Sequence, residues 1–254
     1  MKKIFASDFD NTLYFHNKTP RIAPETVTAI RAFQDAGHLF GLCTGRPAFG
    51  MEENYKDLFR PDFVIASSGG VIIDADGTPL FERKIPFETL SVIEQLGREA
   101  HYFGAVHADG RFVMLDAPGN PFPALESIPS VEAVRNHPVH GISFMTGSET
   151  EAEAFLETVL HSCSGTVTAY RNRNAVDIVP AGCSKGLGLH MAKDLFGAER
   201  TYGIGDSLND LPLLEAADHS FTFRSAPDQL KRAASQLVDN ADEALIFALK
   251  EELL

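Results

Sequence analysis

The sequence lacks several features that would assign it to a specialised class of protein. Its 254 residues contain no uncharged apolar run long enough to cross a bilayer. The apolar residues between the basic start, MKK, and Asp8 are too few for a signal-peptide core. The three cysteines, Cys43, Cys163 and Cys183, are odd in number and far apart, which favours reduced thiols over a disulfide framework. Together these absences favour a cytoplasmic protein.

Basic charge is also scarce. The chain has 22 lysine and arginine residues against 35 aspartate and glutamate residues, a formal net charge of −13, and no dense basic run. Nucleic acid and membranes are therefore not expected as partners. Hydrophobic residues make up 44% of the chain, which is ordinary for a globular protein of one large domain or two unequal ones. Nothing in the sequence indicates the oligomeric state.

The first and last parts of the chain alternate short apolar runs with amphipathic stretches. This alternation is typical of βαβ units and a parallel sheet. Asp76-Gly77 between two apolar runs is in addition a strong hairpin signal. The pattern predicts core strands at residues 4–9, 38–43, 63–66 and 201–204, and helices at residues 24–37, after the turn at 44–47, and at 184–196.

The middle of the chain has a different pattern. Between residues 84 and 182, predicted strand pairs cluster with helices around a proline-rich loop at 118–138. Such clustering favours a separate α+β module. We therefore expect an α/β core formed by residues 1–83 and 183–254, with an α+β domain inserted at residues 84–182.

Four polar islands fall where predicted core strands end or a helix begins. They are DFDNT at residues 8–12, TGR at 44–46, SKG at 184–186 and GDSLND at 205–210. In an open parallel sheet, ligands bind in the crevice beyond the carboxyl ends of the strands. The islands, separate in sequence, are therefore expected to converge in space.

Each island also has an ordinary structural explanation. Asp8 and Asp10 are common turn formers, Thr44 and Asp206 can cap helices, and Lys185 alone is most simply a solvated surface lysine. These explanations do not account for four carboxylates, a lysine and a hydroxyl-glycine pair that are all expected at one sheet edge. The combination favours a functional site.

In this order, the four islands resemble the four motifs of the haloacid dehalogenase superfamily. The long insertion between the second and third motifs resembles the cap of its Cof-type phosphatases, and Ala226-Pro227 extends the similarity beyond the fourth motif. The resemblance implies a Rossmann-like parallel-sheet core and an inserted α+β cap that determines substrate specificity. It also implies Mg²⁺-dependent hydrolysis of small phosphate monoesters, such as sugar phosphates.

The resemblance further implies a role for each motif residue. Asp8 would be the nucleophile that becomes an aspartyl phosphate, ionised at neutral pH, and Asp10 the general acid and base. Lys185 would neutralise the nucleophile and the phosphate. Phosphate or substrate binding is implied for Thr44, Gly45, Arg46 and Asn209, and Mg²⁺ binding for Asp8, the backbone carbonyl of Asp10, and Asp206, with Asp210 as an outer-shell partner.

Two other functions fit part of this pattern. The related phosphomannomutases share the nucleophile and an inserted cap, but transfer a phosphoryl group between sugar positions. A phosphate-sensing module would accept a phosphoryl group on an aspartate without turnover. The paired acids Asp8 and Asp10 favour turnover, because the second acid supplies the proton transfers that hydrolysis requires.

The chain departs from the family pattern at three positions. Asn11 replaces the usual glycine, Ser68 begins Ser-Gly-Gly where Asn-Gly-Ala is usual, and Ser225 replaces an asparagine. Contacts to the substrate are expected to differ there. Arg171 and Arg173 are interpreted as solvated charges in a turn of the cap. No metal motif is formed by the cap histidines, which are His101, His107, His137 and His140.

Overall fold

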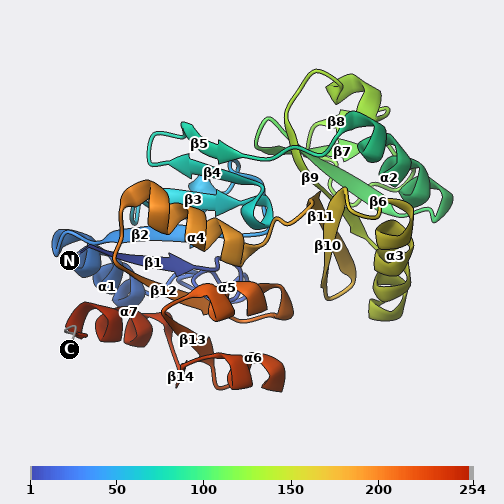
Figure 1. Ribbon diagram of the computed structural model, residues 1–254. Helices are drawn as coiled ribbons and strands as arrows, with labels where there is room; N and C mark the ends of the chain where they lie inside the picture. The colour runs from blue at the N-terminus through green and yellow to red at the C-terminus, as the bar shows by residue number, and fades with distance from the viewer. Residues whose placement is uncertain (1, 252–254) are drawn as a thin grey trace.

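Two sheets organise the protein, shown in Figure 1 as a computed structural model that describes residues 2–251. The core sheet has eight strands in the order β14-β13-β12-β1-β2-β3-β4-β5. Its strands are parallel from β14 to β3, and antiparallel pairs join β3 to β4 and β4 to β5. The strands are β1 (Lys3–Ser7), β2 (Leu39–Cys43), β3 (Phe63–Ala66), β4 (Val71–Asp74), β5 (Pro79–Glu82), β12 (Arg200–Gly205), β13 (His219–Phe223) and β14 (Gln236–Val238).

Alternate side chains of the core strands enter two hydrophobic layers. Phe5 of β1 packs with residues of α1 and α7 on one face of the sheet, whereas Ile4 and Ala6 pack with residues of α4 and α5 on the other. This alternation follows from the two-residue repeat of a strand. The core helices are α1 (Pro24–Asp35), α4 (Lys185–Phe196), α5 (Leu211–Ala216), α6 (Asp228–Ala233) and α7 (Ala241–Lys250).

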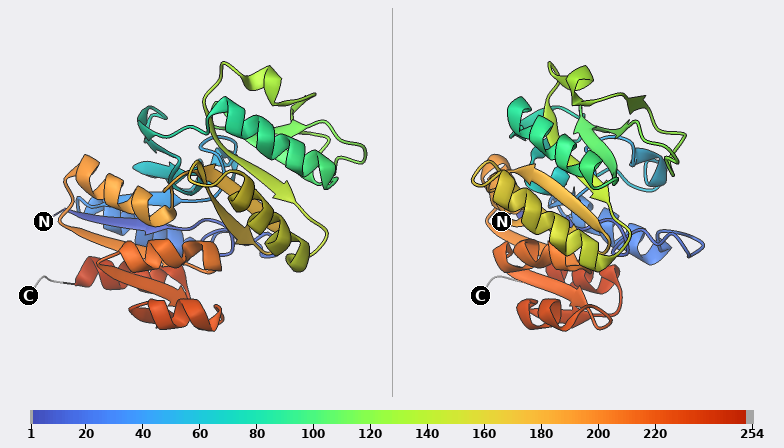
Figure 2. Two further views of the ribbon diagram at one scale, coloured as in Figure 1. Left: turned by 45° about the vertical axis from the view of Figure 1, so that its right-hand side comes forward. Right: turned by 90° about the vertical axis from the view of Figure 1, so that its right-hand side faces the viewer.

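The second sheet has six strands in the order β10-β11-β9-β6-β7-β8. Its pairs are antiparallel except for β7 with β8. Helices α2 and α3 pack on one face, and Figure 2 shows them side by side. The elements are β6 (Phe103–Ala108), β7 (Arg111–Leu115), β8 (Ser127–Ile128), β9 (Val139–Met145), β10 (Val167–Asn172), β11 (Ala175–Pro180), α2 (Phe87–Glu99) and α3 (Glu149–Ser162).

The order of the core strands determines where a ligand can bind. From β1 the chain proceeds to β2 on one side, while β12 adds to β1 on the other side. Such a reversal opens a crevice beyond the carboxyl ends of the strands, which is the usual ligand site of an open α/β sheet. The first, second and fourth polar islands follow β1, β2 and β12 and so meet at this crevice.

The sequence predicted most of this architecture. The Rossmann-like core with an inserted α+β domain is confirmed, and so is the hairpin of β4 and β5. The domain boundaries at residues 83/84 and 182/183 stay a prediction. The helix expected after residues 44–47 is wrong: only a single 3₁₀ turn, Glu52–Asn54, forms there, after Gly50 in a left-handed conformation (φ +102°). Among residues 2–251, no helix combines the length and apolar character that crossing a membrane requires.

Candidate active site

A cavity of about 310 Å³ lies between the two sheets, at the crevice described above. This volume is at the lower end of the range for small-molecule sites. Seven of the nine residues assigned to the site from the sequence line it: Asp8, Asp10, Thr44, Gly45, Arg46, Asp206 and Asn209. The other two, Lys185 and Asp210, are buried beside Asp8. The structure thus brings all nine residues to one place.

Lys185 is the central cation of the site. Its Nζ donates a hydrogen bond to Asp8 Oδ1 at 2.6 Å and another to Asp210 Oδ1. Only 1% of its side chain is exposed, so the explanation of Lys185 as a solvated surface lysine is wrong. Ser184 caps helix α4 by accepting a hydrogen bond from the amide of Leu187, which places Lys185 at the first helical position.

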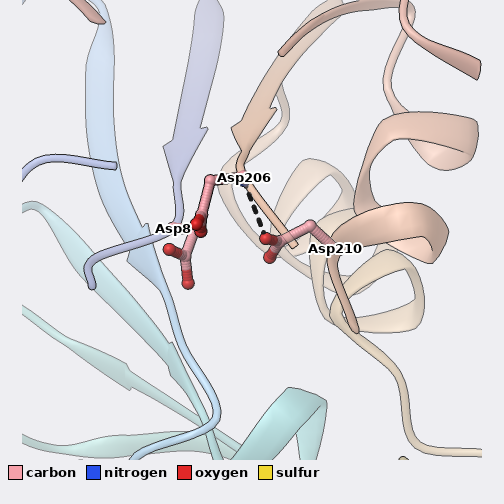
Figure 3. A group of neighbouring side chains, drawn as sticks. All are labelled: Asp8, Asp206 and Asp210. Atoms are coloured by element: carbon pink, nitrogen blue, oxygen red, sulfur yellow. Dashed lines mark hydrogen bonds between the residues drawn. The ribbon is translucent and has the colours of Figure 1, made fainter. Parts of the chain in front are cut away.

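Asp210 holds the loop after β12 in place. Its Oδ2 accepts hydrogen bonds from the amides of Asp206 and Ser207, both at 3.0 Å; the first is the dashed line in Figure 3. Gly205 makes room for this side chain, because a Cβ built on Gly205 would lie 2.4 Å from Cβ of Asp210. With Oδ1 bound to Lys185 and Oδ2 to the loop, Asp210 serves to position its neighbours.

Burial and neighbouring charges shift the pKa values of the residues in this cluster. Burial, followed by the charge of Asp210, raises the pKa of Asp8 to about 8, although Lys185 lowers it. A pKa of about 8 differs from the expectation that Asp8 is ionised at neutral pH. Burial and Asp210 likewise raise the pKa of Asp206 to about 6. Burial alone would lower the pKa of Lys185, but Asp210 and Asp8 raise it well above its ordinary value.

The three carboxylates of this cluster suit a divalent cation. Asp8, Asp206 and Asp210 each offer an oxygen, and these oxygens lie within 4.8 Å of one another (Figure 3). Hard cations prefer such oxygen ligands, and Mg²⁺ commonly uses only one or two protein carboxylates. Because both oxygens of Asp210 already accept hydrogen bonds, Asp8 and Asp206 are the better candidates for direct ligands.

Asp10 is held differently from Asp8. Arg46 donates two hydrogen bonds to it, from Nε to Oδ2 at 2.7 Å and from an Nη to Oδ1 at 2.6 Å. The His16 ring lies 3.2 Å from Oδ1. Asn11 follows in a left-handed conformation (φ +60°), which asparagine tolerates in place of the usual glycine. The pairing of Arg46 with Asp10 was not expected from the sequence.

The remaining predicted ligands line the cavity from its core side. Thr44 is buried, and its hydroxyl accepts a hydrogen bond from the amide of Arg46 at 3.1 Å, which stabilises the turn after β2. Asn209 does not contact Lys185 through any hydrogen bond recorded among residues 2–251; its side chain accepts one from Ser207 Oγ at 2.6 Å. Binding of phosphate by these residues stays a prediction.

The opposite wall of the cavity comes from the inserted domain. Four residues form it: Phe112, Asn172, Arg173 and Asp177. Arg173 stands in the turn between β10 and β11, with φ +55°, and its charge opposes the rise in the pKa of Asp206 that burial causes. Sequence analysis singled out only Arg173 among the four, and interpreted it as a turn charge. The turn expected around Arg171 and Arg173 joins β10 to β11, but its proximity to Asp206 was not expected from the sequence.

Several known proteins are similar to this chain over nearly its whole length. The chain is 26% identical to a 5-amino-6-(5-phospho-D-ribitylamino)uracil phosphatase of Bacillus subtilis, over 99% of this chain and 98% of the relative. It is 24% identical to a pyridoxal phosphate phosphatase of Escherichia coli, over 99% of both chains. Its fold matches that of a sugar phosphatase of haloacid dehalogenase subclass IIB with a TM-score of 0.82, at 20% identity and over 97% and 99% of the two chains.

A protein-family model described as haloacid dehalogenase-like hydrolase matches residues 5–248, nearly the whole chain. The predicted enzyme class is thereby confirmed as a hydrolase of this type, and the relatives named above are phosphatases. On this evidence the chain belongs to the haloacid dehalogenase-like hydrolase family.

Proposed function

We propose that this protein hydrolyses phosphate monoesters of small metabolites through an aspartyl phosphate on Asp8, with Mg²⁺ as cofactor. The observation that carries the proposal is the ion pair between Asp8 and Lys185, buried directly beside a cavity lined by the predicted phosphate ligands. The names of the relatives, among them a ribitylamino-uracil phosphatase and a pyridoxal phosphate phosphatase, support a small phosphorylated substrate.

Asp8 is positioned to attack phosphorus with one defined oxygen. Lys185 occupies Oδ1, which leaves Oδ2 as the attacking atom. A bond then forms between Oδ2 and phosphorus, and the bond from phosphorus to the ester oxygen breaks. The leaving oxygen takes a proton from Asp10. In the second step, water loses a proton to Asp10 and attacks phosphorus, which releases phosphate and restores the Asp8 carboxylate.

Asp10 can serve in both steps only if Arg46 changes partners. Both oxygens of Asp10 accept hydrogen bonds from Arg46 in this structure, so neither can donate to a leaving group. A bound phosphate would compete for the guanidinium, because Arg binds phosphate oxygens as readily as carboxylates. Arg46 would thereby release Asp10 and hold the phosphate, which is the role predicted for it.

The carboxylates of Asp8 and Asp206 would hold Mg²⁺, and a contribution from the carbonyl of Asp10 stays a prediction. When bound, the cation would neutralise phosphate charge and favour the ionised form of Asp8. Lys185 contributes a second positive charge next to Oδ1 of the Asp8 carboxylate. The two anions, phosphate and Asp8, can then approach each other.

Release of inorganic phosphate from an aryl phosphate tests this proposal. The metal-stripped protein should be inactive in excess chelator and regain activity on addition of Mg²⁺. Release of phosphate also distinguishes hydrolysis from phosphoryl transfer between sugar positions. Full activity in chelator, or no turnover with Mg²⁺ on any ester of a metabolite panel, would contradict the proposal.

A further inference from the structure

A buried hydrogen-bonded chain connects the core to the cavity wall of the inserted domain. Ser67 Oγ lies 3.0 Å from His107 Nδ1, His107 Nε2 lies 3.1 Å from Ser143 Oγ, and Ser143 Oγ donates to Asp177 Oδ1 at 2.6 Å. Burial lowers the pKa of His107 to about 3, so the ring is neutral and has one donor and one acceptor. Since Ser143 donates to Asp177, His107 donates from Nε2 and accepts from Ser67.

The direction of these hydrogen bonds, together with the position of Asp177 in the sheet, determines which atoms of Asp177 are available to a ligand. Asp177 pairs in register with Ser143 on the neighbouring strand β9, and its neighbours Val176 and Ile178 pack into the hydrophobic core on the other face. Asp177 therefore points away from helices α2 and α3 and lines the cavity. With Oδ1 bound to Ser143, it still has lone pairs to accept a hydrogen bond from a ligand.

Asp177 lies next to the predicted phosphate-binding turn. A Cβ built on Gly45 would be 3.6 Å from Asp177 Oδ2 and also 3.6 Å from Ser68 Oγ. Ser68 Oγ is buried and has no hydrogen-bond partner among residues 2–251. A buried hydroxyl without a partner costs free energy that a bound polar group would recover. Two oxygens, one an acceptor and one able to donate or accept, thus lie next to the turn predicted to bind phosphate.

We propose that Asp177 selects the leaving group of the substrate by accepting a hydrogen bond from a hydroxyl on the carbon next to the phosphate ester, with Ser68 as a second partner. The preferred substrates are then phosphate esters of small sugars or polyols. A carboxylate at this position repels a second anionic group on the substrate and offers nothing to an aromatic leaving group. Phe112, in the same wall, offers an apolar surface for the carbon skeleton of such a substrate. This inference rests on the proposed phosphatase function.

Three phosphate esters test the inference on the full-length protein with Mg²⁺. Glycerol 3-phosphate and propane-1,3-diol monophosphate differ only in the hydroxyl next to the phosphorylated carbon, and phenyl phosphate has no such group. A hydrogen bond to a charged acceptor predicts that kcat/KM for glycerol 3-phosphate exceeds that for the diol phosphate on the order of tenfold or more. Equal values for the pair, with phenyl phosphate hydrolysed, would overturn the inference alone. No phosphate release from any ester would instead contradict the proposed function.

Substitutions test whether Asp177 causes the preference for glycerol 3-phosphate over the diol phosphate. In Asp177→Ala the ratio between the two esters should fall toward one, mainly because kcat/KM for glycerol 3-phosphate decreases. Asp116→Ala, which alters an exposed carboxylate of the same domain outside the cavity, should keep the wild-type ratio. Asp177→Asn keeps the volume and one acceptor oxygen, so it should lower the ratio partly and provides a second test if the alanine variant does not fold. Equal loss on all three esters would contradict a role in selecting the leaving group.

Ser143 and Ser68 provide a finer test of the same subsite. Ser143 acts as a positioning residue through Asp177, so Ser143→Ala should reduce the ratio through a higher KM for glycerol 3-phosphate, with kcat for phenyl phosphate unchanged. Ser68→Ala should give a smaller reduction of the ratio, because the core hydroxyl is the second partner. A wild-type ratio in both variants would contradict this arrangement.

Discussion

The two walls of the cavity hold their charges in opposite ways. On the core wall, Lys185 is buried between Asp8 and Asp210, and each of these charges has a partner within the protein. On the wall of the inserted domain, Arg173 lines the cavity in a turn and has no ion pair recorded among residues 2–251. Preorganised charge suits the step that is common to all phosphate monoesters. A charge that has no fixed partner suits recognition of a particular substrate.

The strongest test of this contrast is removal of the buried cation. Lys185→Met should lower kcat/KM on an aryl phosphate on the order of 10² or more, because Asp8 and phosphate lose the charge between them. The matched control is Lys193→Met on the same helix, which removes a lysine paired with Asp218 outside the cavity. Thermal unfolding of both variants separates catalytic loss from instability. Activity of Lys185→Met within a few-fold of wild type would contradict the role of Lys185.

A smaller effect is expected on the wall of the inserted domain. Arg173→Ala should raise KM on the order of tenfold and change kcat less, because the guanidinium lines the cavity as a positive charge for an anionic substrate but has no assigned part in the chemical step. Arg171→Ala is the matched control: Arg171 pairs with Glu149 and Glu153 on helix α3 and does not line the cavity. Steady-state kinetics with a sugar phosphate measures KM and kcat of both variants. An equal rise in KM for both variants would remove the distinction between the two arginines.

These two arginines also show what the sequence could and could not predict. Asp8, Asp206 and Lys185 were found because they follow strand ends or begin a helix, in an order that matches a family. Arg171 and Arg173 have the same side chain two residues apart and looked equivalent. The left-handed backbone at Arg173 ends the alternation of strand β10, so Arg173 faces the cavity and Arg171 faces helix α3. That difference depends on the turn conformation, which the local residues do not specify uniquely.

Other features escaped sequence analysis for similar reasons. The pairing of Arg46 with Asp10 joins residues 36 apart in the chain and requires knowledge of how the turn after β2 folds. The alignment of Ser67, His107, Ser143 and Asp177 depends on how the two sheets pack together, and histidines and serines are too common to reveal it. The core wall could be predicted because its motif residues follow the strand ends, whereas the other wall depends on tertiary packing.

A further expected effect concerns stability and pH. His107 has a pKa of about 3 in the folded protein because it is buried, against an ordinary value of 6.5 when exposed. Between these values the unfolded state binds more protons than the folded state, so the free energy of unfolding decreases as pH falls from 6.5 toward 3. The contribution of this one residue is at most about 1.4 kcal/mol per pH unit.

Urea unfolding at pH 7, 6 and 5 measures this contribution. His107→Gln should be less stable than wild type at pH 7 but should lose less stability on acidification. His137→Gln, which alters an exposed histidine paired with Asp109, should keep the wild-type dependence on pH. If His107→Gln and wild type showed the same pH dependence, the pKa of His107 would not be lowered in the folded protein, which would contradict this prediction.

The central claim is that Asp8 attacks phosphorus and Asp10 transfers the protons. Rapid-quench experiments with a ³²P-labelled aryl phosphate compare Asp8→Asn with Asp10→Asn. An aryl leaving group needs little protonation, so Asp10→Asn should form the phosphoenzyme and hydrolyse it slowly, and labelled protein should accumulate. Asp8→Asn should give neither labelled protein nor product. Normal turnover by Asp8→Asn, with Asp10→Asn inactive and unlabelled, would contradict the account and favour direct attack of water on phosphorus.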